Sequence, residues 1–141
     1  MIQGRVCVVD DDASVRRALC RFLTAVGYEV ATFESGAAYL ASTASTAPSC
    51  LLLDLRMPGM NGLELQQRIA GTPHGVPVIF ITGHGLGEVR GLAMAAGSLA
   101  VLDKPLVEDT LLEAIEGALE VSRGLARPES AKRPESRTPG S

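Results

Sequence analysis

Short hydrophobic runs alternate with amphipathic stretches along most of this chain. Residues 5–10 and 49–54 are almost continuously apolar until an aspartate closes each run, which is typical of strands buried on both faces of a parallel sheet. The same reasoning predicts three more strands, at 28–33, 77–82 and 99–102. Between the strands, apolar residues recur at helical spacing. The predicted helices are 13–26, 35–42, 62–70, 88–96 and 107–119.

The alternation of strands and helices indicates an α/β fold. Asp12 is placed to cap the first helix and Gly27 to end it. Five β/α units with short links imply right-handed crossovers and a doubly wound five-stranded parallel sheet, with five helices covering both faces. In such sheets, ligands bind beyond the carboxyl ends of the strands. The site should therefore be sought among the residues that follow the strands.

Composition limits the class of protein. The 141 residues suit one domain, and with 46% hydrophobic but only 4% aromatic residues the core must be built mainly from aliphatic side chains. No apolar run approaches the ~20 residues that span a bilayer, and no secretory signal is visible, so we expect a cytoplasmic protein without membrane contact. Cys7, Cys20 and Cys50 lack a metal-binding spacing, and we expect three buried free thiols.

The charge is unevenly distributed. Residues 122–141 carry five basic and two acidic groups, whereas the rest of the chain carries eight basic and 14 acidic groups, a net charge of −6. An acidic body is a poor match for a nucleic acid backbone, so we expect no nucleic acid contact by this domain. The last segment is rich in proline and poor in apolar residues, which predicts a disordered tail or linker at 122–141 after a domain at 1–121.

Three aspartates fall where two predicted strands end. Asp10 and Asp11 close the first strand, and Asp54 closes the third. If these strands are neighbours, three like charges meet, which is unfavourable unless a cation or proton neutralises them. Carboxylate oxygens are natural ligands of Mg²⁺. We therefore expect a magnesium site in which Asp11 and Asp54 bind directly, Asp10 holds a metal-bound water, and the backbone carbonyl of Arg56 completes the protein ligands.

The same edge holds groups suited to phosphoryl transfer. A carboxylate such as Asp54 is a competent nucleophile towards phosphorus. The charge on the transferred group needs electrostatic partners, and the ammonium group of Lys104 and the hydroxyl group of Thr82 would supply them beside Mg²⁺. These groups match the requirements of phosphoryl transfer.

Four short segments in this chain resemble the signature segments of bacterial response-regulator receiver domains, and the FixJ-like (NarL/FixJ) subfamily is the most similar. In order along the chain they are VVDDDASVRRAL, LLLDLRMPGMNG, VIFITGH and LDKP. The resemblance covers 1–121 and implies a flavodoxin-like fold with the strand order 2-1-3-4-5. It is specific because all four segments occur in register.

The resemblance also implies a role for each site residue. Asp54 would be phosphorylated by a sensor histidine kinase, and the acidic pocket would hold Mg²⁺ or Mn²⁺. Thr82 and Lys104 would contact the phosphoryl group. The Lys104–Pro105 peptide bond would be cis, a state that an ordinary bond before proline adopts only ~5–6% of the time.

One position departs from many members of the family. Receivers often carry an aromatic residue three positions before the lysine, and its rotation reports phosphorylation to the outer face. Here that residue is Val101. Because valine cannot make an aromatic flip, we expect switching to rely on Thr82 and the loop 83–87, through a modest, backbone-led change.

Three other functions are open to an acid-rich α/β fold. A phosphatase with an aspartate nucleophile resembles a D-x-D pattern, whereas the second residue after Asp54 is Arg56. A flavodoxin-like cofactor binder needs a Ser/Thr/Gly-rich loop after the first strand, where this chain has three acids that would repel a phosphate. A degenerate receiver that works without phosphate is disfavoured because Asp54, Thr82 and Lys104 are all present.

The output of the domain is a separate question. We expect a signalling domain that catalyses only its own phosphorylation and dephosphorylation and controls transcription through an effector. The alternative is a stand-alone receiver that acts by protein–protein interaction or as a phosphorelay intermediate. Receivers commonly form homodimers through the fourth helix, fifth strand and fifth helix, which here would be 88–96, 99–102 and 107–119.

Overall fold

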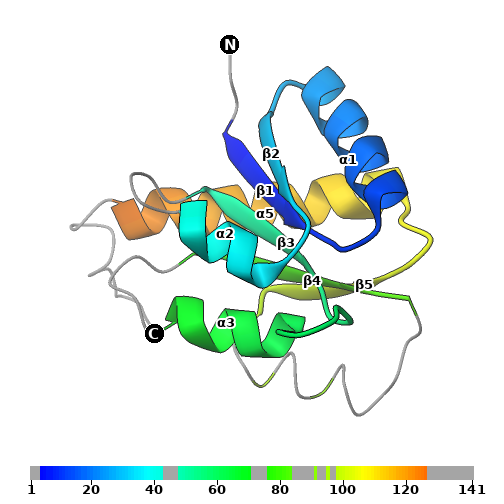
Figure 1. Cartoon of the computed structure of the whole chain (residues 1–141). Helices are drawn as coiled ribbons and strands as arrows, with labels where there is room; N and C mark the ends of the chain where they lie inside the picture. Colours follow the sequence, from blue (N-terminus) through cyan, green and yellow to red (C-terminus); the bar gives the residue numbers. More distant parts are fainter. Residues whose placement is uncertain are drawn as a thin grey trace.

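Five parallel strands form a single sheet in the computed structural model, which describes residues 4–42, 48–70, 76–83, 91, 95 and 98–126 (Figure 1). The strands are β1 (Arg5–Val9), β2 (Glu29–Phe33), β3 (Cys50–Asp54), β4 (Val78–Thr82) and β5 (Ala100–Asp103). Their order in the sheet is β2-β1-β3-β4-β5. This arrangement confirms the predicted doubly wound α/β fold and its strand order.

The helices of the described residues lie where the sequence predicts them. They are α1 (Ala13–Val26), α2 (Gly36–Ser42), α3 (Gly62–Ala70) and α5 (Glu108–Ala126). The helix expected at 88–96 lies largely outside the described residues, although Gly91 and Ala95 are described and helical. Helix α5 continues to Ala126, beyond position 119, where the last helix was expected to end.

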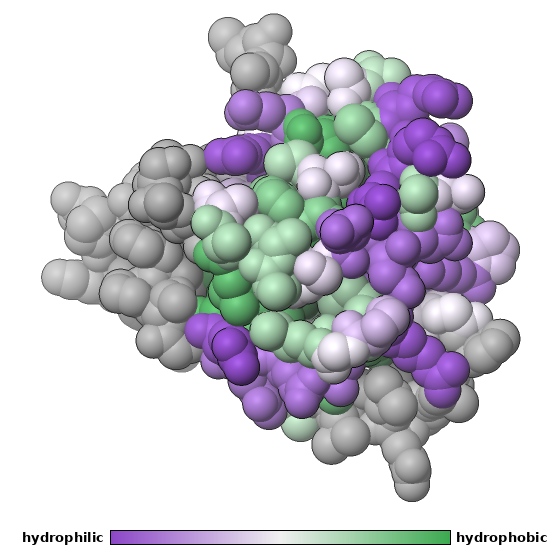
Figure 2. Space-filling view, in the orientation of Figure 1, coloured by the Kyte–Doolittle hydropathy of each residue, from purple (hydrophilic) through white to green (hydrophobic). Residues whose placement is uncertain are grey.

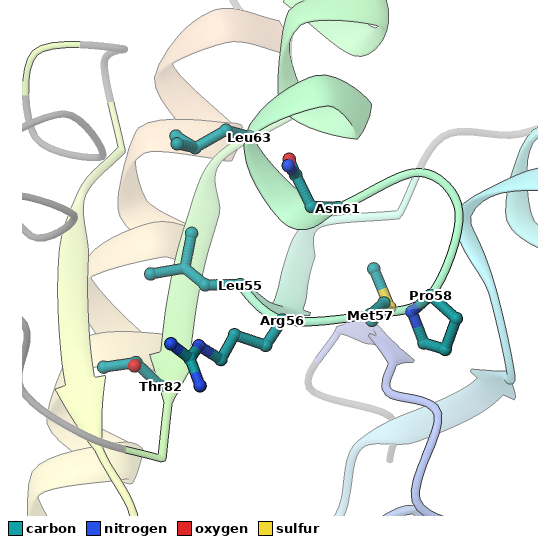
Figure 3. Close-up of a pocket in the computed structure, with 7 residues that line it drawn as sticks. All are labelled: Leu55, Arg56, Met57, Pro58, Asn61, Leu63 and Thr82. Atoms are coloured by element: carbon teal, nitrogen blue, oxygen red, sulfur yellow. The ribbon is translucent and has the colours of Figure 1, made fainter.

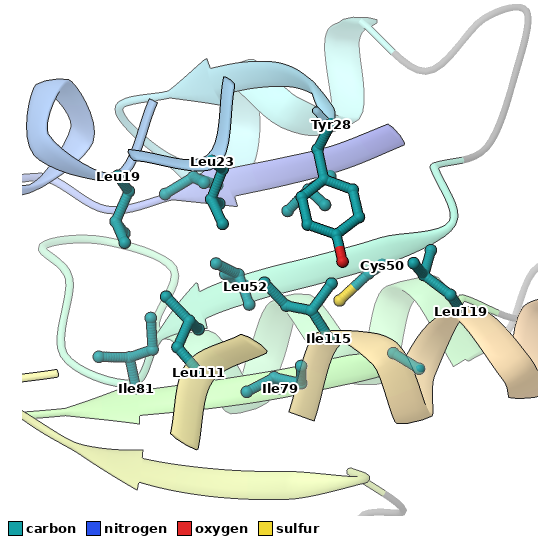
Figure 4. Close-up of a cluster of buried hydrophobic side chains, with 13 residues drawn as sticks. Leu19, Leu23, Tyr28, Cys50, Leu52, Ile79, Ile81, Leu111, Ile115 and Leu119 are labelled. Carbon is teal, nitrogen blue, oxygen red and sulfur yellow. The ribbon is translucent and has the colours of Figure 1, made fainter. Parts of the chain in front are cut away.

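The central strands are buried on both faces, as their apolar runs predict. Every residue of β3 and β4 is buried. Alternate residues of the sheet point to opposite sides, and α1 and α5 cover one side with Leu19, Leu23 and Ile115 (Figure 4). Helices α2 and α3 cover the other side with Tyr39 and Leu65. The sheet is therefore the middle layer of three.

Helix α1 is capped at both ends, as the sequence predicts. The Asp12 carboxylate accepts a hydrogen bond from the Ser14 N–H at 2.8 Å, and Gly27 ends the helix with a φ of 122°. In the space-filling view, hydrophilic residues cover much of the side on which α1 lies, and hydrophobic residues gather near the middle (Figure 2). The polar face of α1 is thus turned to solvent.

Strand order and register bring the predicted site residues to one edge. Strand β1 pairs with β3, with Val9 opposite Leu53, so the residues that follow each strand are neighbours. On the other side, β3 pairs with β4 and β4 with β5. The Lys104 N–H donates to the Thr82 carbonyl at 2.8 Å, which fixes the chain just after β5.

The three cysteines were expected to be buried, and the structure confirms this for two of them but not for Cys20. Cys7 and Cys50 lie within the sheet, whereas Cys20 is only half-buried on α1. Burial raises the pKa of the Cys50 thiol to about 12, and also raises that of Cys7. These two thiols are therefore core residues without thiolate reactivity.

Helix α3 begins in close contact with the end of β3, and this contact requires glycine at its first position. A Cβ atom on Gly62 would lie 2.6 Å from the Asp54 carbonyl oxygen and 3.0 Å from the Leu55 Cα. We expect Gly62→Ala to destabilise the fold by about 1–3 kcal/mol, because backbone must shift to admit the methyl group. Denaturant unfolding measures the change.

The matched control is Gly117→Ala, within α5. A Cβ atom there meets nothing within 4 Å, so alanine should stabilise the helix by about 0.5–1 kcal/mol. Equal effects of the two substitutions would contradict the close approach at Gly62.

Candidate functional site

Three carboxylates meet at the carboxyl edge of the sheet. Oxygen atoms of Asp10, Asp11 and Asp54, one from each, all lie within 4.8 Å of one another. Asp10 is completely buried and Asp54 is 5% exposed, whereas Asp11 is exposed. Two of the acids are therefore held in the protein interior while the third faces solvent. The structure brings together the acids that the sequence predicted to meet.

Lys104 supplies a cation to the two buried acids. Its ammonium nitrogen lies 3.2 Å from Asp10 Oδ2, within hydrogen-bonding distance, and 3.6 Å from Asp54 Oδ2. The Lys104–Pro105 peptide bond is cis, as the resemblance implied. One ammonium group is thus shared by two carboxylates.

The remaining oxygens of the buried acids are held by backbone N–H groups. Asp10 Oδ1 accepts from the Asp12 N–H at 2.9 Å, and Asp54 Oδ1 accepts from the Arg56 N–H at 3.1 Å. Each carboxylate therefore faces a backbone donor with one oxygen and Lys104 with the other. These contacts orient both carboxylates.

The carboxyl group of Asp54 has a raised pKa. Burial raises the pKa of Asp54 to about 6, and the nearby Asp10 carboxylate adds to the rise, while the Arg56 N–H and Lys104 oppose it. The two carboxylates raise the pKa of Lys104 above its ordinary value, against the effect of its own burial. Lys104 therefore stays charged, and the excess negative charge remains on the acids.

A cavity of about 510 Å³ lies next to the acid cluster (Figure 3). Its lining residues come from the segment that follows β3, the start of α3 and the end of β4, and are Leu55, Arg56, Met57, Pro58, Asn61, Leu63 and Thr82. The Arg56 side chain extends across it towards Thr82 (Figure 3). Thr82 is buried. The cavity begins at Leu55, the residue after Asp54, and the three acids are not among its lining residues.

Other predicted residues take different positions. Val101 lies opposite Phe80 in the sheet and is buried in the core. Most of the loop 83–87 lies outside the described residues, so its expected role in switching stays a prediction. The structure gives the Arg56 N–H a partner in Asp54, while its carbonyl remains a predicted metal ligand.

Arg16 was not anticipated from the sequence. Its Nη1 atom donates to the Asp10 backbone carbonyl at 2.7 Å, from the first part of α1. An arginine at this point of an amphipathic helix is indistinguishable from the exposed Arg17 in the pattern alone. One feature of the sequence could have indicated its role. A cation near a helix N-terminus is unfavourable because of the helix dipole, so an arginine there suggests a compensating contact.

The donor set fits a divalent cation. Three carboxylates offer hard oxygen ligands, which suit Mg²⁺ or Mn²⁺, and a single lysine leaves two of the three charges uncompensated. The exposed carboxylate of Asp11 leaves solvent access on one side. The residues present therefore fit a magnesium site.

A parallel five-stranded sheet with acids after β1 and β3 and a lysine after β5 defines the class of aspartate-based phosphoacceptor domains. The sequence of the chain matches the model of the response regulator receiver domain over residues 6–116. The chain belongs to this family, whose members bind Mg²⁺ at an acidic pocket and interact with histidine kinases.

Relatives support the FixJ-like subfamily. Nodulation protein W of Bradyrhizobium diazoefficiens is 42% identical over 118 residues, which cover 84% of this chain and 52% of that protein. The transcriptional regulatory protein FixJ of the same organism is 33% identical, over 91% of this chain and 62% of that protein. The crystal structure of FixJ-N matches with a TM-score of 0.79 and 38% identity, over 85% of this chain and 96% of that one.

The chain spans about half the length of the curated relatives that it matches. Among the described residues, none of the helices has the length and apolar character needed to cross a membrane.

The raised pKa of Asp54 predicts a pH-dependent stability difference between wild type and Asp54→Asn. Because the carboxyl group binds its proton more tightly when folded, its contribution to stability is full below its ordinary pKa of 3.8 and is lost as pH rises through about 6. Without metal, Asp54→Asn should be more stable than wild type by about 1–3 kcal/mol at pH 7, and the difference should shrink towards pH 4.

Denaturant unfolding at several pH values in a chelator measures this difference. Saturating Mg²⁺ should reduce it, because the cation stabilises the wild-type site by mass action. A difference that is independent of both pH and Mg²⁺ would contradict the electrostatic origin of the effect.

Proposed function

We propose that this domain accepts a phosphoryl group on Asp54 from a sensor histidine kinase, in a magnesium-dependent reaction, and changes conformation to control an output. The observation that carries the proposal is the meeting of three acids, two of them buried, around the ammonium group of Lys104. Such a cluster costs stability unless a cation compensates it. The cluster lies at the carboxyl ends of the strands, where sheets of this kind bind ligands, and this position supports a site of phosphoryl chemistry.

In the proposed reaction, an oxygen of Asp54 attacks the phosphorus of a phosphohistidine. The new P–O bond forms as the P–N bond breaks, and the departing imidazole nitrogen takes up a proton. Backbone contacts hold Asp54 in place, so the nucleophile is oriented before the donor arrives. When bound, Mg²⁺ would neutralise the acids and the charge on the transferred group.

Lys104 and Thr82 would receive the new phosphoryl oxygens. Lys104 already lies 3.6 Å from Asp54 and remains charged, so it can compensate charge on the transferred group. Thr82 ends β4, which pairs with β3, and it lines the same cavity as Leu55 and Arg56, the two residues that follow Asp54. Movement of Thr82 towards the phosphoryl group would change the packing at the end of β4, next to β5 and Val101. This change is the proposed switch, in place of an aromatic rotation.

A second hollow supports a partner beside the site. It has a volume of about 300 Å³ and lies between α1 and the segment that follows β5. Its lining is mostly apolar and includes Val15, Leu19, Phe22, Pro105, Leu106 and Leu111, together with Lys104. A kinase helix resting there would bring its phosphohistidine close to Asp54. The homodimer through the helix expected at 88–96, β5 and α5 remains a proposal, and the exposure of Leu99, Val107 and Val121 supports it.

The output depends on sequence that most of the relatives carry beyond the matched region. TdiR and FixJ are transcriptional regulatory proteins by name, and the chain covers 56% and 62% of them. We infer that transcription is the controlled process, through an effector. A stand-alone receiver that works by protein–protein interaction or within a phosphorelay is the second candidate.

Incubation with Mg²⁺ and an acyl phosphate, followed by intact mass measurement, tests the central step. Wild type should gain the mass of one phosphoryl group, because Asp54 attacks the phosphorus and the carboxylate of the donor leaves. Asp54→Asn should gain none, and wild type in a chelator should gain none.

Asp12→Asn is the matched control. An asparagine at position 12 would still cap α1, and this position lies outside the cluster of three acids, so the variant should be phosphorylated like wild type. A mass gain in both wild type and Asp54→Asn, or in neither, would refute the proposal.

A further inference from the structure

The link between β1 and α1 carries two of the three acids, and a side chain from α1 fixes it. Arg16 Nη1 donates a hydrogen bond to the Asp10 backbone carbonyl at 2.7 Å. We propose that Arg16 is a positioning residue for the divalent metal site, because it fixes the peptide group between Asp10 and Asp11 and so places the Asp11 carboxylate. This inference rests on the proposed function, since it takes the acid cluster to bind a divalent cation.

Every polar group of Asp10 has a separate partner. Its N–H donates to the Phe33 carbonyl at 3.1 Å, which extends the pairing of β1 with β2. Its two carboxylate oxygens accept from the Asp12 N–H and from Lys104. Only the carbonyl points to Arg16, and a hydrogen bond from a charged donor is stronger than one between neutral groups. Loss of Arg16 would release this carbonyl alone.

Asp11 depends on that carbonyl for its direction. Because the peptide bond is planar, the direction of the Asp10 carbonyl sets the plane from which the Asp11 backbone continues. Within the described part of the chain, the exposed Asp11 carboxylate makes no hydrogen bond or ion pair of its own, yet its oxygen lies within 4.8 Å of those of Asp10 and Asp54. Its position near the other acids is therefore imposed by the backbone.

The placement of Arg16 is unfavourable for the helix by itself. It is the fourth residue of α1, and the first turn of this helix contains no acidic residue. A cation near a helix N-terminus is repelled by the partial positive charge of the helix dipole. Arg16 therefore does not stabilise the helix through its charge, and its hydrogen bond to the Asp10 carbonyl gives it a different role.

A purely electrostatic role makes the opposite prediction. If Arg16 only contributed positive charge near the acids, its removal would strengthen the binding of a cation, because one repulsive charge would be lost. If it positions the Asp11 carboxylate, its removal should weaken binding. The direction of the change in affinity therefore separates the two roles.

Titration of the protein with Mn²⁺, followed by electron paramagnetic resonance of the free ion, measures this affinity without any phosphorylation. Arg16→Ala should weaken binding about tenfold or more, the usual effect of removing a group that orients a metal ligand. Arg16→Lys keeps the charge and a donor at shorter reach, so its affinity should fall between those of Arg16→Ala and wild type. Arg17→Ala is the matched control, since Arg17 is exposed on the same turn, and it should bind like wild type.

Phosphorylation by an acyl phosphate gives a second readout. The Mg²⁺ concentration for half-maximal rate should rise in Arg16→Ala, while the rate at saturating Mg²⁺ should stay close to that of wild type, because Asp54 and Lys104 are untouched. General damage to the fold would instead lower the saturated rate.

Equal or tighter Mn²⁺ binding by Arg16→Ala would overturn the inference, and if that variant does not fold, equal binding by Arg16→Lys would do so. Absence of Mn²⁺ binding in wild type would instead refute the metal site on which the proposed function depends.

Discussion

One ammonium group shared by two buried carboxylates is the interaction on which this domain depends. Lys104 reaches Asp10 at 3.2 Å and Asp54 at 3.6 Å, while Asp11 adds a third acid at the surface. Lys104 matches only one of the three negative charges, and burial together with the Asp10 carboxylate raises the pKa of Asp54. That imbalance creates the affinity for a divalent cation. The same repulsion that lowers the stability of the metal-free protein therefore favours the binding of a divalent cation.

The fold around the site serves to hold these charges together. Pairing of β1 with β3 puts Asp10 beside Asp54, and the pairing of β4 with β5 brings the chain after β5, with Lys104, to the same edge. Gly62 allows α3 to start against the Asp54 carbonyl. Backbone N–H groups then fix one oxygen of each buried acid. Because backbone contacts orient both acids, we expect little reorganisation when a phosphoryl donor arrives.

The sequence predicted those parts that depend on local pattern. Apolar runs closed by aspartate located β1 and β3, and the shared edge of parallel strands predicted that Asp10, Asp11 and Asp54 would meet. The contact of Arg16 with Asp10 was not predictable, because the pattern of α1 does not distinguish Arg16 from Arg17 and only the folded loop selects one of them. The close approach at Gly62 was missed for the same reason, since it depends on how α3 meets β3. Helix α5 runs to Ala126, past Leu119, the last inward-facing residue of its apolar pattern, so that pattern did not indicate where the helix ends.

Burial and the neighbouring Asp10 carboxylate should raise the pKa of Asp54 in the metal-free protein, and a bound divalent cation should lower it. Carbon-13 NMR of the Asp54 carboxyl group across a pH titration, with and without Mg²⁺, tests this central claim most directly. The account predicts a pKa of about 6 in the metal-free protein and a value well below its ordinary 3.8 when Mg²⁺ is bound. The same pKa under both conditions, or an ordinary value without metal, would contradict it.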